Sequence, residues 1–260
     1  MRLVFLGTGT SHGIPVVGCS CPVCTSTDPR NKRTRASVWI EITKPSLDLS
    51  FIIDTATEFR LQAVRERINH LDAVLLTHAH ADHLHGLDDI RPLCRKKPIP
   101  VYGTEHTLQE LKERFSYIFH PKQEGGGLPR LELRTVEGYI PFQLEGIHVL
   151  PLPVKHGELD ILGYRIGNLA YITDCSAIPS RTMEQLENLE VLVLDALRKK
   201  PHPTHFSISE ALEVIQILRP KQAFLTHLCH DVEHNEIKKE LPRGVAPSYD
   251  GLELDLEDPS

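Results

Sequence analysis

The chain has 260 residues, of which 40% are hydrophobic and 25% are charged, and its net charge is −6 at pH 7. These values are ordinary for a globular protein with a sizeable core. The negative charge disfavours a long nucleic acid as partner, and no apolar run is long enough to span a membrane. The first residues carry too short an apolar run for a signal peptide, so we expect a cytoplasmic protein with one domain over residues 1–260.

Short apolar runs alternate with helical patterns along the chain, which predicts an α/β or α+β fold. The predicted strands cover, in chain order, residues 2–6, 37–42, 49–53, 71–76, 99–102, 131–136, 147–152, 162–166, 169–173, 191–194 and 222–225. The predicted helices cover residues 58–68, 84–93, 107–119 and 209–218. Residues 122–129 contain three consecutive glycines, and we expect them to form a flexible loop that could act as a lid.

Several of the apolar strands end abruptly in an acidic residue or a histidine. These strand-end residues are Asp54, His78, His156, Asp174, Asp195 and His227. The end of a strand is where a rigid scaffold presents catalytic groups. The chain also contains 15 histidines, many of them in short clusters, and metal ligation explains such clusters best.

Residues 78–83 read His-Ala-His-Ala-Asp-His and follow an apolar strand directly. Imidazoles and a carboxylate at this density suit divalent transition metals. His78 and His80 can face one metal, while Asp82 and His83, one turn further on, can face a second. Two metals about 3.5–4 Å apart can share and activate one water. A solvated histidine-rich turn is the alternative, but it leaves the other strand-end residues unexplained.

A second motif places the three thiols of Cys19, Cys21 and Cys24 within six residues. Cytosolic thiols stay reduced, so we interpret them as metal ligands before disulfides. Thiolates bind zinc strongly, and a closed structural site needs four ligands. His230 is the candidate for the fourth ligand, and the spacing leaves Cys229 as a competitor.

The sequence from Thr77 to His83 resembles the T-H-x-H-x-D-H signature of the metallo-β-lactamase superfamily. The later strand-end residues match the rest of the family pattern in order, over nearly the whole chain. The cysteine motif together with T-H-x-x-H near the end is similar to the phosphoribosyl cyclic phosphodiesterase branch of this superfamily. The resemblance implies a four-layer αββα sandwich, in which two mixed sheets carry helices on both outer faces.

The same resemblance implies two catalytic metal ions, Mn²⁺ or Zn²⁺, and one structural Zn²⁺. One catalytic ion would be held by His78, His80 and His156. The other would be held by Asp82, His83 and His227. Asp174 would bridge the two ions. The structural zinc would be held by Cys19, Cys21, Cys24 and His230.

Three further residues receive roles from the resemblance. Asp54 would orient a ligand histidine without binding metal itself. His205 would donate a proton to the leaving oxygen or stabilise the phosphoryl charge, so it is a candidate catalytic residue together with the metal ligand Asp82. Asp195 would orient His205 or a metal ligand.

The implied activity is hydrolysis of a small phosphodiester, such as a cyclic phosphate, by a hydroxide bound between the two metals. Hydrolysis of a lactone or thioester and 3′-processing of tRNA are alternatives on the same scaffold. A metal-binding protein without enzymatic activity is disfavoured, because no ligand of the catalytic pattern is missing. We expect no membrane partner and leave a homodimer open.

Overall fold

The computed structural model describes residues 1–45, 47–120 and 127–259. Its strands in the first half are β1 (Arg2–Gly7), β2 (Ser37–Lys44), β3 (Leu47–Ile53), β4 (Ala73–Leu75), β5 (Ile99–Gly103) and β6 (Leu131–Thr135). The later strands are β7 (Phe142–Leu144), β8 (Ile147–His156), β9 (Leu159–Ile166), β10 (Leu169–Ile172), β11 (Val191–Asp195), β12 (Gln222–Thr226), β13 (Val245–Pro247) and β14 (Glu253–Asp255). Among these described residues, no helix is long and apolar enough to cross a membrane.

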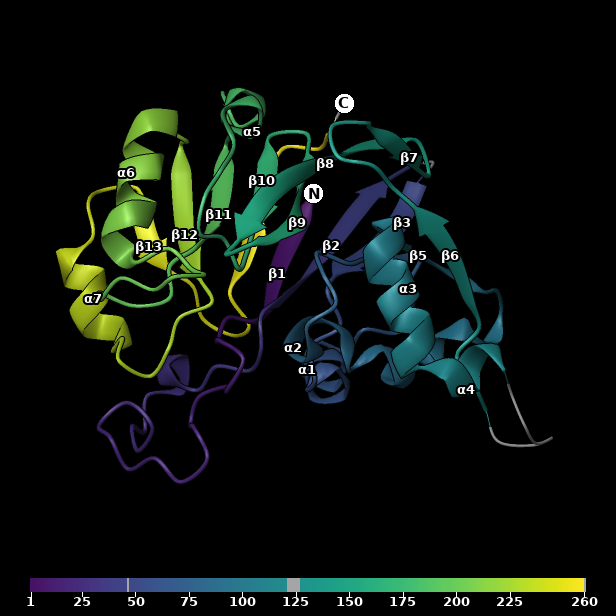
Figure 1. The fold of residues 1–260 in the computed structure, drawn as a ribbon, viewed down its shortest axis with the longest axis horizontal. Helices are drawn as coiled ribbons and strands as arrows, with labels where there is room; N and C mark the ends of the chain where they lie inside the picture. Colours follow the sequence, from purple (N-terminus) through teal and green to yellow (C-terminus); the bar gives the residue numbers. More distant parts are fainter. Residues whose placement is uncertain (46, 121–126, 260) are drawn as a thin grey trace.

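The described strands form two seven-stranded mixed sheets (Figure 1). The first sheet has the order β14-β1-β2-β3-β4-β5-β6, and the second has the order β13-β12-β11-β10-β9-β8-β7. In the first sheet β3, β4, β5 and β6 are parallel, and in the second β10, β11, β12 and β13 are parallel. Parallel strands bring their carboxyl ends to one edge of a sheet, so residues that follow them gather there.

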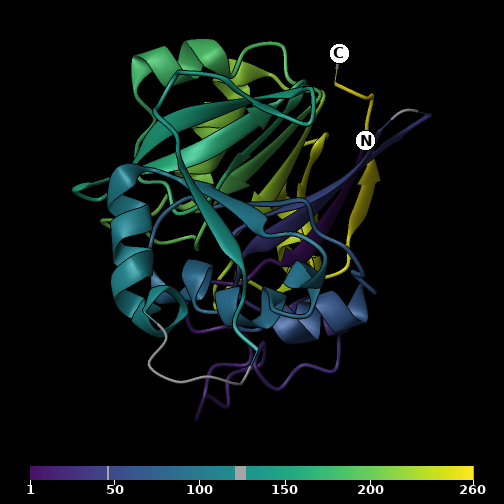
Figure 2. The same ribbon diagram turned by 90° about the vertical axis from the view of Figure 1, so that its right-hand side faces the viewer.

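Helices cover the outer face of each sheet. The first sheet carries α1 (Phe59–Arg65), α2 (Ala81–Leu84), α3 (Glu105–Arg114), α4 (Ser116–Phe119) and the 3₁₀ turns η2 (Leu87–Ile90) and η3 (Leu93–Arg95). The second sheet carries α5 (Ser180–Gln185), α6 (Ile208–Leu218) and α7 (His234–Glu240). Figure 2 shows the four layers, with green helices above the second sheet and blue helices below the first. This arrangement confirms the expected αββα sandwich.

Alternation along the strands explains why the sheets pack in this way. In β1, Leu3 and Phe5 belong to the core between the two sheets, whereas Val4 and Leu6 pack under the helices of the first sheet. All four side chains are fully buried. A strand with both faces apolar must be covered on both sides, and the two sheets and two helical layers provide that cover.

Two of the helix predictions are wrong in extent. The helix expected over residues 84–93 is broken into the end of α2, η2 and η3. One break lies at Gly86, whose N–H donates to the Thr55 carbonyl at 3.0 Å instead of continuing the helical ladder. Only glycine fits there, because a Cβ would lie 2.0 Å from the carbonyl oxygen of Ala56. Pro92, just before η3, has no N–H to continue a helical ladder.

The helix expected over residues 107–119 begins earlier and is divided. It begins after Thr104, whose side chain accepts a hydrogen bond from the backbone N–H of Thr107. It ends at Phe115, where the backbone turns (φ −109°, ψ 36°) and the ring enters the core under the first sheet. Tertiary burial of this ring therefore overrides the local helical pattern. The loop expected over residues 122–129 lies largely outside the described residues.

Candidate metal centre

The strand-end residues singled out from the sequence lie together where the carboxyl ends of the parallel strands meet. Asp54 follows β3, His78 lies just beyond β4, and Asp174 follows β10. His156 and Asp195 are the last residues of β8 and β11, and His227 follows β12. The short helix α2 closes this edge, at the lower side of the sheets in Figure 1.

Three of these residues have backbones in the left-handed region. The φ angles are 64° at Asp54, 53° at Asp174 and 58° at His227. A side chain in this region costs roughly 1 kcal/mol or more, so the surrounding structure must hold it there. Such strain is common at functional sites, because it can point a side chain in a direction that an unstrained turn does not allow.

Three groups of candidate metal ligands share the carboxylate of Asp174, and two of them correspond to the ligand sets that the resemblance implies. The remaining group adds Asp195, His205 and His227 to Asp174. In each group, the ligand atoms lie within 4.8 Å of one another. The first group contains His78, His80, His156 and Asp174. The second group contains Asp82, His83, Asp174 and His227. The structure thus places Asp174 between the two groups, where the resemblance requires a bridging ligand.

The distances within the second group fit a cation at its centre. The Oδ1 atom of Asp174 lies 3.2 Å from Nε2 of His83 and 3.2 Å from Nε2 of His227. Ligand atoms bound to one zinc at about 2.0–2.2 Å are separated by roughly 3–3.5 Å. The Nε2 atoms of His78, His83 and His227 are buried and have no hydrogen-bond partner within the described part of the chain. Buried polar atoms of this kind need a partner, and a shared divalent metal provides one.

In three of the histidine rings, those of His78, His83 and His156, the Nδ1 atom contacts a neighbouring protein group. Nδ1 of His83 donates to the Asp54 carboxylate at 2.7 Å, and Nδ1 of His156 donates to the Thr204 carbonyl at 2.8 Å. Nδ1 of His78 lies 2.9 Å from the Thr77 hydroxyl. These contacts turn each Nε2 atom toward the centre, as is typical for histidines that bind metal.

The charges of the centre are strongly coupled. Burial opposes the charged form of His83, but the carboxylates of Asp174, Asp82 and Asp54 raise its pKa well above the usual value. Burial likewise opposes the charge of Asp174, but His227 and His83 hold its pKa well below the usual range. The raised pKa values of His83 and His227 favour protons that balance the carboxylates, and divalent cations would replace those protons.

His205 borders the centre. Its ring stacks on His227, with 4.7 Å between the ring centroids and 15° between the planes. The carboxylate of Asp195 lies 3.4 Å from Nδ1 of His205 and 3.5 Å from Nδ1 of His227, and it accepts a hydrogen bond from the N–H of Phe206 at 3.0 Å. Asp195 therefore contacts both histidines, which matches the two roles that the sequence left open for it.

The cysteine motif forms a second, separate cluster. Nδ1 of His230 lies 3.3 Å from the sulfur of Cys19, and 3.6 Å from those of Cys21 and Cys24. In a zinc tetrahedron with bonds of about 2.3 Å to sulfur and 2.0 Å to nitrogen, sulfur and nitrogen are about 3.5 Å apart. The cluster therefore has the dimensions of a closed zinc site. The structure brings His230 to the three thiols, whereas the Cys229 sulfur accepts a hydrogen bond from the N–H of Asp231 at 3.3 Å.

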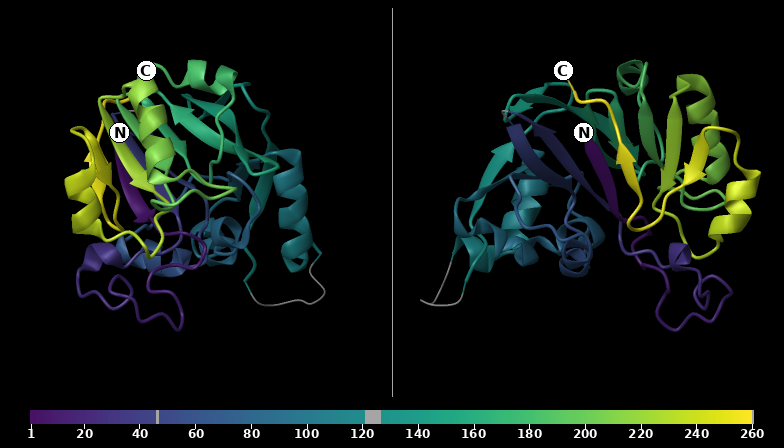
Figure 3. Two further views of the ribbon diagram at one scale, coloured as in Figure 1. Left: turned by 60° about the vertical axis from the view of Figure 1, so that its left-hand side comes forward. Right: turned by 180° about the vertical axis from the view of Figure 1, so that it is seen from behind.

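The environment of the thiols differs from one to the next. The N–H of Cys24 donates to the Cys21 sulfur and lowers the pKa of Cys21 to about 6. Burial raises the pKa of Cys24 to about 11. Figure 3 shows this segment in purple as a loop that projects from the edge where the strand-end residues gather.

One short segment after β12 serves both clusters. His227 belongs to the ligand groups around Asp174, and His230, three residues further on, belongs to the cysteine cluster. Between them, the N–H of Leu228 donates to the Thr8 carbonyl at 3.0 Å, and the Leu228 carbonyl accepts from Thr10 at 3.3 Å. The glycine-rich turn after β1 thus anchors the chain between the two clusters.

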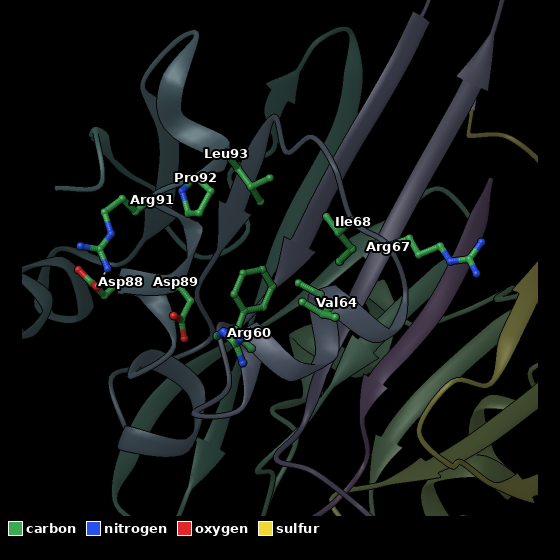
Figure 4. Close-up of a pocket in the computed structure, with 11 residues that line it drawn as sticks. Arg60, Val64, Arg67, Ile68, Asp88, Asp89, Arg91, Pro92 and Leu93 are labelled. Carbon is green, nitrogen blue, oxygen red and sulfur yellow. Dashed lines mark hydrogen bonds and ion pairs between the residues drawn. The ribbon is translucent and has the colours of Figure 1, made fainter. Parts of the chain in front are cut away.

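The sequence reasoning did not single out Thr204. Its carbonyl orients His156, and a backbone carbonyl carries no signal in the sequence. It also did not find the cavity of about 590 Å³ between α1 and residues 88–93. Figure 4 shows the aliphatic and charged side chains that line this cavity, and none of them belongs to either cluster.

Comparisons with known proteins identify the family and support the fold. Residues 45–228 match the β-lactamase superfamily domain. A crystal structure described as a new diphosphatase from the PhnP family is 41% identical, with a TM-score of 0.91, and the match covers 99% of this chain and 98% of that chain. Zinc-bound PqqB from Methylobacterium extorquens is 18% identical, with a TM-score of 0.81 and coverage of 98% and 100%, and it supports the fold alone.

One curated relative is longer than this chain. An octanoyltransferase from Porphyromonas gingivalis is 40% identical over 260 residues, which cover 99% of this chain and 52% of that protein. The chain thus spans about half the length of this relative.

Proposed function

The chain belongs to the β-lactamase superfamily and has its metal-dependent hydrolase fold, and from this we propose that it hydrolyses a small phosphodiester, such as a cyclic phosphate. The observation that carries the proposal is the pair of ligand groups that share Asp174. The net charge of −6 supports a small substrate over a long nucleic acid.

The donor set suits two divalent metal ions, because it consists of imidazole nitrogens and carboxylate oxygens. We assign the ligands as the sequence predicts, with His78, His80 and His156 on one ion. Asp82, His83 and His227 would hold the other, and Asp174 would contact both. When bound, Mn²⁺ or Zn²⁺ ions supply a water that is activated near neutral pH and positive charge beside the phosphoryl group.

The side chains around the ions have separate tasks. Asp54 fixes the ring of His83, and the Thr204 carbonyl fixes the ring of His156. The Asp195 carboxylate lies 3.4 Å from Nδ1 of His205 and would orient its ring. His205 can then donate a proton to the departing oxygen, which an alkoxide needs in order to leave.

The cysteine cluster has a structural role in this proposal. Three thiolates and one imidazole close a tetrahedron and leave no position open for substrate. We assign it a single Zn²⁺, which would fix the projecting loop against the segment after β12.

A substituted diphosphate is a second candidate substrate, and one observation favours it. The structure that is 41% identical to this chain is described as a diphosphatase. In a diphosphate the bond that breaks joins phosphorus to a bridging oxygen, so the same water, metals and proton donor would serve.

The test is elemental analysis of the protein together with assay of the same preparation on bis(p-nitrophenyl) phosphate. The proposal expects up to three metal ions per chain, two at the centre around Asp174 and one at the cysteine cluster. It also expects turnover that depends on manganese or zinc. His78→Ala should abolish turnover while the protein stays folded. Bound metal without phosphodiester turnover would direct the search to lactones and thioesters, and a lack of bound metal under reducing conditions would contradict the proposal.

A further inference from the structure

A second histidine, His202, stands beside His205 and has no role in the proposed function. The two ring centroids are 5.2 Å apart and the planes are inclined by 48°. The ring of His205 is in turn 4.7 Å from the rings of both His156 and His227. His202 is therefore the next imidazole outward from the metal centre, on the side of the candidate proton donor.

Thr204 holds His202 in a defined orientation. The N–H of Thr204 donates to Nδ1 of His202 at 3.4 Å, and the Thr204 hydroxyl lies 3.2 Å from the same nitrogen. A backbone N–H can only donate, so Nδ1 is the acceptor and the ring proton is on Nε2. The Thr204 carbonyl also accepts the hydrogen bond from His156. One residue thus fixes a metal ligand and His202 together.

The Nε2 atom of His202 is left for a ligand. It has no hydrogen-bond partner among the described residues. It is also open to solvent, because it is not among the buried polar atoms that lack a partner. The ring itself is half-buried. Burial, followed by the effects of His205 and Arg198, lowers the pKa of His202, which favours the neutral ring. A solvated surface histidine has neither this restraint nor this position.

The loop that carries His202 favours an anionic ligand. Residues 198–205 include no carboxylate. The guanidinium of Arg198 donates to the carbonyls of Lys200 and Pro201, at 3.3 Å each, which supports the loop from within. Lys200 is exposed and has no ion-pair partner in the described part of the chain.

We propose that His202 binds the leaving group through its Nε2–H, that this group is a second phosphoryl group, and that the preferred substrates are therefore substituted diphosphates. This inference rests on the second candidate of the proposed function, hydrolysis of a substituted diphosphate, and favours it over the phosphodiester. The oxygen of water bonds to one phosphorus, and the bond from that phosphorus to the bridging oxygen breaks. The departing phosphate keeps the electron pair and takes a proton from His205, so two phosphate monoesters form. A neutral alcohol or phenol would offer His202 no charged oxygen.

Two substitutions separate binding from support of the loop. His202→Asn keeps an acceptor near the position of Nδ1 for Thr204 but has no donor at the position of Nε2. His202→Gln places an amide N–H near Nε2 but loses the acceptor. His148→Asn is the matched control, because His148 is exposed and contacts Gln143 instead of the centre.

The assay compares ADP-ribose, a substituted diphosphate, with bis(p-nitrophenyl) phosphate. A hydrogen bond to a charged oxygen predicts a ~10-fold loss of kcat/KM on ADP-ribose for His202→Asn, mainly through KM, with recovery in His202→Gln. The loss on the diester should stay within about 2-fold for every variant. The inference would be overturned if His202→Asn lost kcat/KM equally on both substrates or lost none on either. It would also be overturned if the wild-type protein turned over the diester but not ADP-ribose.

A binding measurement separates this inference from the proposed function. Calorimetry with methylenediphosphonate, which cannot be hydrolysed at its bridge, reports on the second phosphoryl group without turnover. We expect ~10-fold weaker binding in metal-loaded His202→Asn and unchanged binding in His148→Asn. If wild-type protein turns over neither substrate, the proposed function fails. In that case equal affinity of wild type and His202→Asn would also overturn the role of His202.

Discussion

The Asp54 carboxylate lies 2.7 Å from Nδ1 of His83, and neither side chain is exposed to solvent. The same carboxylate accepts hydrogen bonds at 2.8 Å from the N–H and from the hydroxyl of Thr77. Burial raises the pKa of Asp54, and the contacts with His83 and Thr77 oppose this effect. Asp54 thus ties the end of β3 to the first turn of the metal motif.

Asp54→Asn tests this relationship with a side chain of the same shape. The amide has one acceptor oxygen for three donors, so at least one of them loses its partner. We expect a roughly 10- to 100-fold loss of metal affinity or of kcat/KM, because the ring of His83 is no longer fixed. Metal content after dialysis against a weak chelator measures the effect. Asp48→Asn, at an exposed carboxylate in β3, is the control. Full metal retention in Asp54→Asn would show that Asp54 does not orient His83.

Cys21→Ser and His230→Asn should each remove one zinc per chain. Both substitutions take a ligand from a four-membered cluster and leave an open zinc site. The free energy of unfolding should fall, because metal binding to such sites is coupled to folding. Metal analysis and chemical denaturation measure the two effects. Cys94→Ala is the control, since Cys94 is a buried thiol outside the cluster and should keep the full zinc content. Unchanged zinc in Cys21→Ser would contradict the assignment.

His205→Gln should lower kcat and leave the metal content unchanged. Loss of a general acid typically costs about 10²–10⁴-fold in rate. The loss should be greatest for an alkyl leaving group and smallest for p-nitrophenolate, which departs without a proton. The measurement is kcat on a series of phosphodiesters that differ in leaving-group pKa. A loss that is the same for every leaving group would exclude His205 as the proton donor. A loss of metal would instead make it a ligand.

The residues that the structure brings together could be picked out from the sequence because the central motif is local. Residues 78–83 carry four candidate ligands, and the strand-end positions of Asp174 and His227 follow from buried strands that parallel pairing brings to one edge. The roles of these residues in metal binding and catalysis stay predictions. The αββα fold is confirmed, but the resemblance was needed to choose it among the α/β and α+β folds that the patterns allow.

Features that depend on tertiary contacts could not be predicted. At the break, the N–H of Gly86 bonds to the carbonyl of Thr55, and Ala56, 30 positions earlier in the chain, leaves no room for a side chain. The choice of His230 over Cys229 depends on how the segment after β12 turns against the cysteine loop. The orientation of His202 comes from the N–H of Thr204. None of these contacts leaves a periodic pattern in the sequence.

His234, at the start of α7, should make stability depend on pH. Its side chain is buried, and its Nδ1 atom has no partner in the part of the chain that the structure describes. Burial, followed by the charges of Arg30 and Arg33, lowers the pKa of His234 to about 4. In the unfolded chain the same group has a pKa of about 6.5.

The sign of the effect follows from proton binding. Between pH 6.5 and about 4 the unfolded chain holds a proton on His234 and the folded chain does not, so acidification favours unfolding. The contribution is fully present above about pH 6.5 and falls by up to about 1.4 kcal/mol per pH unit, roughly 3 kcal/mol in all. Below about pH 4 both states are protonated and the contribution no longer changes.

Urea unfolding of wild type and His234→Phe from pH 8 to pH 4 measures this contribution. The metal ligands also take up protons in this range, but they do so in both proteins, so the difference between the two curves isolates His234. We expect that difference to shift in favour of His234→Phe as the pH falls below 6.5. His148→Gln, at an exposed histidine, should give a curve parallel to wild type. A difference that stays constant with pH would mean that His234 takes up its proton equally well in the folded state, through a local opening of the start of α7.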